Sequence, residues 1–214
     1  MTETTTNFQK DIDDIEQISV VPTLLNVICE TTGIGFAAIA RVTEDKWMTC
    51  MVKDDISFGL RPGDELQIKT TICNEVRELK RSIVIDHVKN DPEFYNHHTP
   101  AMYGFQSYIS VPFVRKDGSF FGTLCAIDPK PHKLNTPAVI GMFNLFADLI
   151  SFHLNALDEV NTLRSKMNKL NKEVETFAFI TSHDLQEPLR KIETFATVIL
   201  DRSFKFVGPG AILF

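Results

Sequence analysis

The feature that most constrains this chain is a helical pattern that begins at Ala138 and continues to about Ser203. A helix of roughly 65 residues would be about 95 Å long at 1.5 Å per residue, far longer than the helices of an ordinary globular domain. Positions a of its heptads are Phe146, His153, Val160, Met167 and Val174, and positions d are Leu149, Ala156, Leu163, Leu170 and Phe177. Such a repeat of apolar positions predicts a coiled coil.

The charges that flank this seam indicate how two helices would pair. Glu159 falls at position g and Arg164 at the next position e, so that these side chains can pair across a parallel two-stranded coiled coil. We therefore expect a parallel homodimer, with residues 158–176 as its coiled-coil linker. His153, at position a, is expected to be a polar residue that sets the register.

The stretch Phe177 to Arg190, FAFITSHDLQEPLR, places a histidine on an amphipathic part of the helix. The apolar residues form a stripe, which predicts that His183 lies on the solvated side. Pro188 has no amide hydrogen, so the carbonyl of Asp184 loses its helical partner and the helix should bend just past His183. Helices usually avoid this cost of about 3 kcal/mol, and a working site that has to deform is one explanation.

The box SHDLQEPLRKI resembles the phosphoacceptor box of sensor histidine kinases, whose dimerisation (HisKA) helix carries a histidine that is phosphorylated from ATP. The resemblance implies that residues 177–203 are this helix, that His183 is the phosphoacceptor, and that Asp184 accepts the proton of the other ring nitrogen. A neutral imidazole has one lone-pair nitrogen to attack phosphorus, which agrees with these roles. The sequence departs from kinases that also dephosphorylate their partners, because Glu187 stands where these often carry Thr or Asn.

The residues before the long helix alternate between short helical patterns and apolar, β-type runs. The predicted helices are at 18–32 and 70–80, and the predicted strands are at 36–42, 47–52, 82–88, 107–114 and 119–127. The last two strands form the clearest hairpin, across Lys116-Asp117-Gly118. This order predicts an α+β domain with an antiparallel-rich sheet and helices on one face, preceded by a polar tail at 1–17.

A second resemblance covers this region. GFQSYISVPFVRKDGSFFGTLCAIDPKPHKL is similar to the end of a GAF domain, a small-molecule sensing module, and the likeness extends back over residues 18–157. It implies a ligand pocket between the sheet and two loops that cross it, Phe58 to Lys69 and Val88 to Ser107. The candidate ligand-binding residues are Phe58, Asp86, His87, Tyr103 and Ser107.

The identity of the ligand stays open in the sequence. Bilin-binding relatives attach the pigment through a cysteine that is commonly followed by histidine, whereas Cys73 and Cys125 are followed by asparagine and alanine. The NKFDE pattern of cyclic-nucleotide-binding relatives is absent. The histidines near Asp91 have no defined ligand spacing, so no metal site is expected. We expect an unidentified small ligand, or none, and no cofactor in this chain.

Charge and hydropathy bear on the partners and the location of the protein. A formal net charge of -6 without a basic stripe argues against nucleic-acid binding. The first residues are polar and acidic, and no apolar run approaches the roughly 20 residues that span a bilayer, so neither a signal peptide nor a membrane anchor is predicted. Four scattered cysteines without a CxxC pair fit reduced thiols. We therefore expect a cytoplasmic protein.

The sequence after Arg202 does not continue the kinase pattern. Residues 204–214 form an atypical apolar tail, and neither a second dimerisation helix nor an ATP-binding domain follows. We expect ATP and Mg²⁺ to act only through a kinase domain supplied in trans, and a response regulator receiver domain to be the partner of phosphorylated His183. Two alternatives remain: a non-catalytic GAF module that dimerises with intact kinases, and a GAF redox enzyme that needs Cys73 or Cys125.

Overall fold

The computed structural model describes residues 7–206, with the side chains of residues 182–184 and 201–206 outside the described part. The chain divides into two compact units, Met1–Glu159 and Val160–Phe214. Most of the predicted apolar tail at 204–214 lies outside the described residues.

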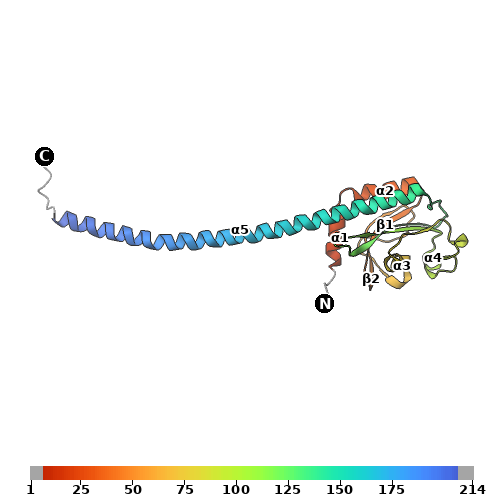
Figure 1. Cartoon of the computed structure of the whole chain (residues 1–214), viewed down its shortest axis with the longest axis horizontal. Helices are drawn as coiled ribbons and strands as arrows, with labels where there is room; N and C mark the ends of the chain where they lie inside the picture. Colours follow the sequence, from red (N-terminus) through yellow and green to blue (C-terminus); the bar gives the residue numbers. More distant parts are fainter. Residues whose placement is uncertain (1–6, 207–214) are drawn as a thin grey trace. The chain divides into compact units, whose positions relative to one another are not determined.

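A six-stranded antiparallel sheet, in the order β3-β2-β1-β6-β5-β4, forms the centre of the first unit (Figure 1). Its strands are β1 (Phe36–Val42), β2 (Lys46–Asp54), β3 (Glu65–Gln67), β4 (Ile83–Ile85), β5 (Ser107–Val114) and β6 (Phe120–Asp128). The two predicted hairpins, β1–β2 and β5–β6, are confirmed, and the pairing of β1 with β6 joins them. At this junction Gly122 lies opposite Arg41, and a Cβ there would be 1.9 Å from the carbonyl oxygen of Ala40.

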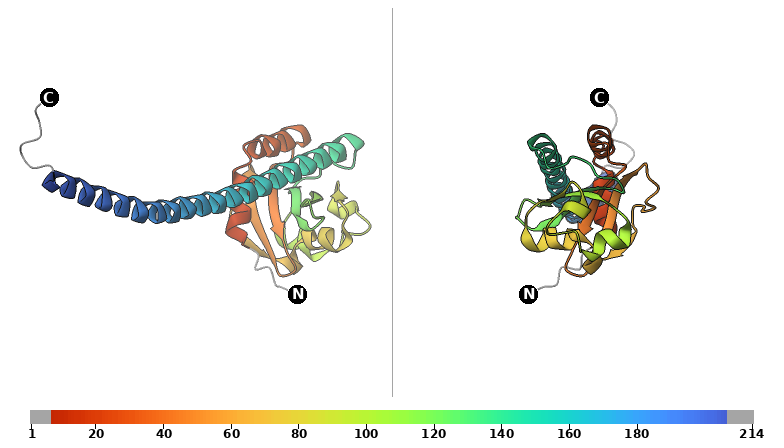
Figure 2. Two further views of the ribbon diagram at one scale, coloured as in Figure 1. Left: turned by 60° about the vertical axis from the view of Figure 1, so that its left-hand side comes forward. Right: turned by 90° about the vertical axis from the view of Figure 1, so that its right-hand side faces the viewer.

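Three helices lie over one face of the sheet: α1 (Phe8–Glu16), α2 (Val21–Thr32) and the first part of α5 (Pro137–Phe206) (Figures 1 and 2). Pro22 occupies the first turn of α2, and Gly33 ends the helix with a φ of 75°. The core under these helices includes Ile28, Phe143 and Leu124, which are all fully buried. The predicted α+β fold, with a long C-terminal helix, is confirmed.

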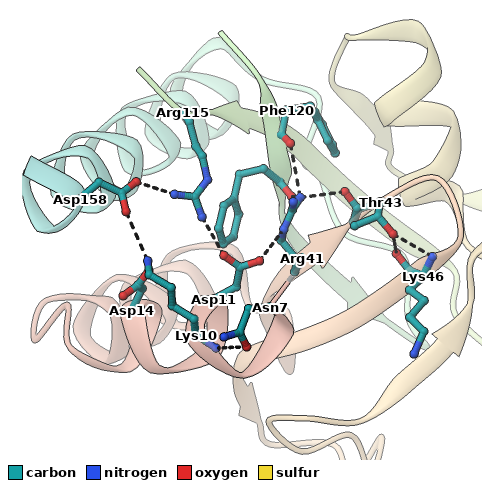
Figure 3. A network of polar contacts seen from close by, with 12 residues as sticks. Asn7, Lys10, Asp11, Asp14, Arg41, Thr43, Lys46, Arg115, Phe120 and Asp158 are labelled. Atoms are coloured by element: carbon teal, nitrogen blue, oxygen red, sulfur yellow. Dashed lines mark hydrogen bonds and ion pairs between the residues drawn. The ribbon is translucent and has the colours of Figure 1, made fainter. Parts of the chain in front are cut away.

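The prediction of a polar tail at 1–17 is wrong for residues 8–16, which form α1. Ile12 and Ile15 of this helix are buried in the core, and so are the carboxylates of Asp11 and Asp14. Asp11 accepts hydrogen bonds from Arg41 Nε (2.8 Å) and Arg115 Nη2 (2.7 Å), as Figure 3 shows. Buried carboxylates are satisfied by such partners, so a helix of polar composition can still pack.

The second face of the sheet is covered by shorter segments. They are α3 (Ile72–Leu79), α4 (His98–Tyr103) and two 3₁₀ turns, η1 (Ile68–Thr70) and η2 (Val88–Asn90). A separate core cluster, which includes Trp47, Ile72, Ile85 and Tyr108, lies between them and the sheet. The sheet is therefore covered on both faces, and the cover of the second face consists mostly of loops and short helices.

The long helix α5 runs for 70 residues without interruption, and Pro188 lies inside it. In the first unit, Phe143, Ala147, Ile150 and Leu154 are buried against the core, and Phe146 and Leu149 of the predicted seam are partly buried there. In the second unit the seam residues are exposed, with exposed fractions of 58% for Leu163 and 59% for Leu170.

Among the described residues, one helix segment, Pro137–Leu200, is long and apolar enough to cross a membrane by length and composition alone. Core helices of water-soluble proteins meet the same criterion. Here the first turns of the segment use Phe143, Ala147 and Ile150 to pack on the core of their own domain.

Candidate functional site

A small cavity lies between the second face of the sheet and the loops that cross it. Its volume is about 50 Å³. Strands β1, β2, β3, β5 and β6 form the sheet side of the cavity, and α3, α4 and the crossing loops form the other side. The lining residues are Phe36, Trp47, Phe58, Leu60, Leu66, Thr71, Cys73, Thr99, Tyr103, Phe105, Tyr108, Cys125 and Ile127. The wall is mostly apolar, with a few polar groups, as in ligand sites of proteins generally.

Two of the five candidate ligand-binding residues line this cavity. Phe58 comes from the first crossing loop and Tyr103 from the end of α4, with ring centroids 6.1 Å apart. The hydroxyl of Tyr103 is 2.8 Å from Thr70 Oγ1, which fixes the ring over the sheet. Gly104, with a φ of 74°, ends α4 directly after this tyrosine.

The other three candidates, Asp86, His87 and Ser107, are not among the residues that line the cavity. Asp86 Oδ1 accepts hydrogen bonds from the amides of Leu134 and Asn135, both at 2.7 Å. His87 Nδ1 lies 3.0 Å from Asn90 Nδ2, while Ser107 Oγ donates to the carbonyl of Lys130 at 2.8 Å. These three side chains secure loops around the sheet, because short polar side chains next to strand ends bond first to nearby backbone.

Two cysteines line the cavity, Cys73 on α3 and Cys125 on β6. Thr123 Oγ1 donates to Cys73 Sγ at 3.3 Å, and the Tyr108 hydroxyl is 3.4 Å from the same sulfur. A hydrogen bond from Cys125, ahead of those from Thr123 and Tyr108, lowers the pKa of Cys73 to about 6, although burial acts in the opposite direction. Burial raises the pKa of Tyr108, so its hydroxyl keeps its proton and can donate to the sulfur.

Trp47 adds a polar group to the same wall. Its side chain is 3% exposed and lines the cavity, and its Nε1–H has no close hydrogen-bond partner among the described residues but interacts with the Cys73 sulfur, which helps to lower the pKa of that thiol. An indole N–H is a donor only, so a group that satisfied it would be an acceptor. The cavity wall therefore presents one indole N–H donor and one polarised sulfur among apolar and aromatic side chains.

Sequence reasoning singled out the crossing loops but not the strand residues of the wall, Trp47 and Tyr108. Both belong to strands that are apolar on their two faces, since both faces of the sheet are covered. The period-two pattern alone does not show which face borders a cavity. The only weak signal was that these residues are a tryptophan and a tyrosine, because a buried Trp or Tyr carries a polar atom that needs a hydrogen-bond partner.

A wider groove adjoins the cavity. It has a volume of about 440 Å³ and shares Phe58, Leu60, Leu66, Tyr103, Phe105 and Ile127 with the cavity wall. Met102 and Pro129 lie at its margins.

The predicted phosphoacceptor region lies in α5. The side chains of His183 and Asp184 are outside the described residues. Glu187 is exposed and forms an ion pair with Lys191 one turn later, at 2.9 Å. Pro188 is exposed within the helix.

No group of three or more His, Cys, Asp or Glu side chains that could hold a metal ion occurs among the residues that the structure describes. The loop histidines have other partners: His97 Nε2 is 2.7 Å from Glu75 Oε1, and His98 Nε2 is 3.0 Å from the carbonyl of Lys69. Both contacts tie the α4 segment to the α3 side of the cavity.

Comparison with known proteins relates this fold to a group of sensory domains. A curated relative, cyanobacterial phytochrome B from Nostoc sp. (strain PCC 7120), is 32% identical over 82 residues, or 38% of this chain, and the matched region spans only 10% of that relative. The structure is similar to the GAF domain of Thermosynechococcus elongatus PixJ in its blue-light absorbing form (TM-score 0.58, 13% identity, 78% of this chain and 98% of that chain). At such an identity the likeness concerns the fold.

The chromophore-binding domain of the bacteriophytochrome RpBphP3 from R. palustris gives a similar result. It matches with a TM-score of 0.55 and 14% identity over 72% of this chain and 61% of that chain. The family model described as "GAF domain" matches residues 17–154, which include the whole sheet, α2, α3, α4 and the first turns of α5, but not α1. The chain belongs to the GAF domain family.

Proposed function

We propose that this chain is the sensory and dimerisation portion of a cytoplasmic two-component sensor histidine kinase. In this proposal the GAF domain senses a small ligand, α5 transmits the signal, and His183 accepts a phosphoryl group. The observation that carries the proposal is α5, a single helix whose first turns pack in the GAF core and which also contains the box SHDLQEPLRKI. A shift or rotation at the domain has a continuous helical backbone along which to reach His183.

Exposed apolar residues in the second unit support a parallel homodimer as the working form. Val160, Leu163, Met167, Leu170, Val174 and Phe177 are 53–71% exposed and recur at intervals of three and four residues. A stripe of this spacing and length on a charged helix fits a second copy of the same helix. Glu159 and Arg164 flank the stripe with opposite charges, which favours the parallel arrangement.

The cavity favours a ligand smaller than a bilin. Drug-sized ligands occupy pockets of about 300 to 1,000 Å³. The cavity between the sheet and the loops has about 50 Å³, so a larger ligand would have to lie mainly in the adjoining groove of about 440 Å³, away from Trp47 and the two cysteines. The cysteine–histidine pair of bilin-binding relatives is also missing at Cys73 and Cys125. We infer that the domain senses a small molecule of a few heavy atoms that can accept a hydrogen bond from Trp47.

Phosphoryl transfer would use groups from two polypeptides. A kinase ATP-binding domain, supplied in trans, would bring ATP with Mg²⁺, and a ring nitrogen of His183 would attack the γ-phosphorus in line with the leaving ADP. Asp184 would accept the proton on the other ring nitrogen in a hydrogen bond and so stabilise the imidazolium. A response regulator receiver domain would then take the phosphoryl group from His183.

Radiolabel transfer from ATP tests this proposal. The chain is incubated with labelled ATP, alone and with the ATP-binding domain of a HisKA-type kinase, as the native sequence and as His183→Gln and His98→Gln. We expect acid-labile label on the native chain and on His98→Gln only when the kinase domain is present, and none on His183→Gln. His98 is the matched control because it is an exposed histidine outside α5.

An absence of label under every condition, with a cognate kinase labelled in parallel, would contradict the phosphoacceptor role. The chain would then be a GAF module that dimerises with intact kinases, for which His183 is dispensable.

A further inference from the structure

The four cysteines of this chain are all buried and all free, yet they have two different environments. Cys29 and Cys50 lie in the core under α1, α2 and α5. Burial raises the pKa of Cys29 to about 11 and that of Cys50 to about 12. These two thiols are packed as small apolar side chains, and such buried thiols are inert.

Cys73 and Cys125 instead line the cavity, and they come from α3 and β6, two elements that pack on each other. Two hydroxyl groups, Thr123 Oγ1 and the Tyr108 hydroxyl, are within 3.4 Å of the Cys73 sulfur. Cys125 Sγ also lies 3.6 Å from the carbonyl oxygen of Ala38, which is a second acceptor for its one thiol proton. The pair is held in place from α3, β5 and β6, so the two sulfurs do not depend on a mobile loop.

The size of the cavity limits what can reach the pair. One buried water needs roughly 10–15 Å³ of accessible volume, so a cavity of about 50 Å³ holds a few water-sized molecules. Hydrogen peroxide and other small hydroperoxides are of this size. The Nε1–H of Trp47, which is near the Cys73 sulfur, can donate to an oxygen of such a molecule inside the cavity.

We propose that Cys73 and Cys125 form a redox-active thiol pair in the GAF cavity, and that the small molecule this pair detects is a hydroperoxide. The sulfur of Cys73 attacks the terminal oxygen of the hydroperoxide, the O–O bond breaks, and the leaving alkoxide or hydroxide takes a proton to become an alcohol or water. Cys73 is then a sulfenic acid. The sulfur of Cys125 displaces its hydroxyl, which leaves as water with the Cys125 proton, and a Cys73–Cys125 disulfide forms.

Atoms and electrons balance over these two steps. The two thiols lose two protons and two electrons in total, and the hydroperoxide takes them up to become an alcohol and water, or two waters in the case of hydrogen peroxide. The disulfide requires the sulfurs to approach to about 2 Å, and Cys73 is on α3, which packs on β5, β6 and β1. Disulfide formation therefore pulls α3 toward the sheet, and the change is passed to the loops that form the cavity wall.

The pH dependence of the first step follows from the groups that face Cys73. The titratable groups among them are Cys125 on β6 and Tyr108 on β5. Because the pKa of Cys73 is lowered from 9.0 to about 6, its thiolate is present above pH 6 and disappears as the pH falls through this value. The rate of its reaction with a small alkylating agent should therefore reach half of its maximum near pH 6, whereas Cys29 and Cys50 stay unmodified in the folded chain.

The test uses the whole chain and hydrogen peroxide. Native protein is treated with peroxide, its remaining thiols are blocked with iodoacetamide after unfolding, and its peptides are mapped by mass spectrometry. We expect one disulfide, between Cys73 and Cys125, with Cys29 and Cys50 recovered as blocked thiols. In Cys125→Ser the reaction should stop at a Cys73 sulfenic acid that a β-diketone probe captures, and Cys50→Ser is the matched control that should still form the disulfide.

Recovery of all four cysteines as blocked thiols, under conditions that oxidise the unfolded chain, would overturn the proposal. A disulfide that includes Cys29 or Cys50 would also overturn it. The pH profile of alkylation on the unmutated chain gives a second test that requires no variant to fold, and a midpoint near pH 9 would count against the site. None of these readouts involves His183, so this proposal and the phosphoacceptor proposal can fail separately.

Discussion

At the scale of single residues, two glycines of this chain have opposite structural roles. Gly122 lies in β6 at the junction of the two hairpins, where an added Cβ would meet the carbonyl oxygen of Ala40 at 1.9 Å. Gly141 lies in α5 with no atom within 4 Å of an added Cβ. The first glycine is required by the close approach of two backbones, and the second leaves an exposed helix position without a side chain.

Alanine at these two positions should change the free energy of unfolding in opposite directions. Gly122→Ala forces β1 and β6 apart and should cost about 3 kcal/mol or more. Gly141→Ala should stabilise the chain by up to about 1 kcal/mol, because alanine is the better helix former. Urea unfolding followed by circular dichroism measures both, and equal stability of Gly122→Ala and the native chain would show that the strands can separate without cost.

At the scale of elements, α1 depends on charges from distant parts of the sequence. Asp11 binds Arg41 on β1 and Arg115 in the β5–β6 turn, and the guanidinium groups of both arginines lie over the ring of Phe121 at 4.9 and 5.0 Å. Arg115 also pairs with Asp158 near the end of the first unit (Figure 3). The helix is thus held by ion pairs as well as by its two isoleucines.

Replacing Asp11 tests this dependence. Asp11→Ala leaves two partly buried guanidinium groups short of a partner, and should lower the free energy of unfolding by about 3 kcal/mol. Asp13→Ala, in the same helix and exposed, should change it by less than about 0.5 kcal/mol. The comparison uses the midpoint of urea unfolding, and a loss at Asp11 no larger than that at Asp13 would mean that the isoleucines alone hold α1.

The elements that the sequence predicted are those with local signals. The hairpins and α2, α3 and α5 have periodic apolar residues, and α2, α5 and the β5–β6 turn also have Gly or Pro at an end. These patterns need no distant partner. The strand β3 and the helix α4, with three and six residues, are too short to show a period. The helix α1 was missed because Asp11 faces the core, and its partners are 30 and 104 residues away.

The candidate site was predictable only in part for the same reason. Phe58 and Tyr103 lie on loops, and loops over a sheet are where pockets form. Cys73 and Cys125 are 52 positions apart in the sequence, and only the packing of α3 on β6 brings their side chains to the same cavity. No local pattern around either cysteine contains this information.

At the scale of the whole molecule, the proposed dimer should depend on the exposed stripe of α5. Leu163→Glu puts two charges into the seam of a parallel pair and removes two leucines, a loss of about 3 kcal/mol or more, which corresponds to at least a hundredfold rise in Kd. Ser165→Glu, two residues later and outside the seam, should leave Kd within a few-fold. Sedimentation equilibrium measures both, and a monomeric native chain, or equal effects of the two changes, would contradict the coiled coil.

The edges of the sheet bear on this self-association. β3 and β4, the two outermost strands, have three residues each, and β3 carries Glu65. Such short edges present few unpaired amide and carbonyl groups to another sheet, and a charged side chain further disfavours stacking of sheets edge to edge. Both edges of the sheet therefore disfavour growth into fibrils. Two copies can pair through α5 at high concentration without their sheets joining edge to edge.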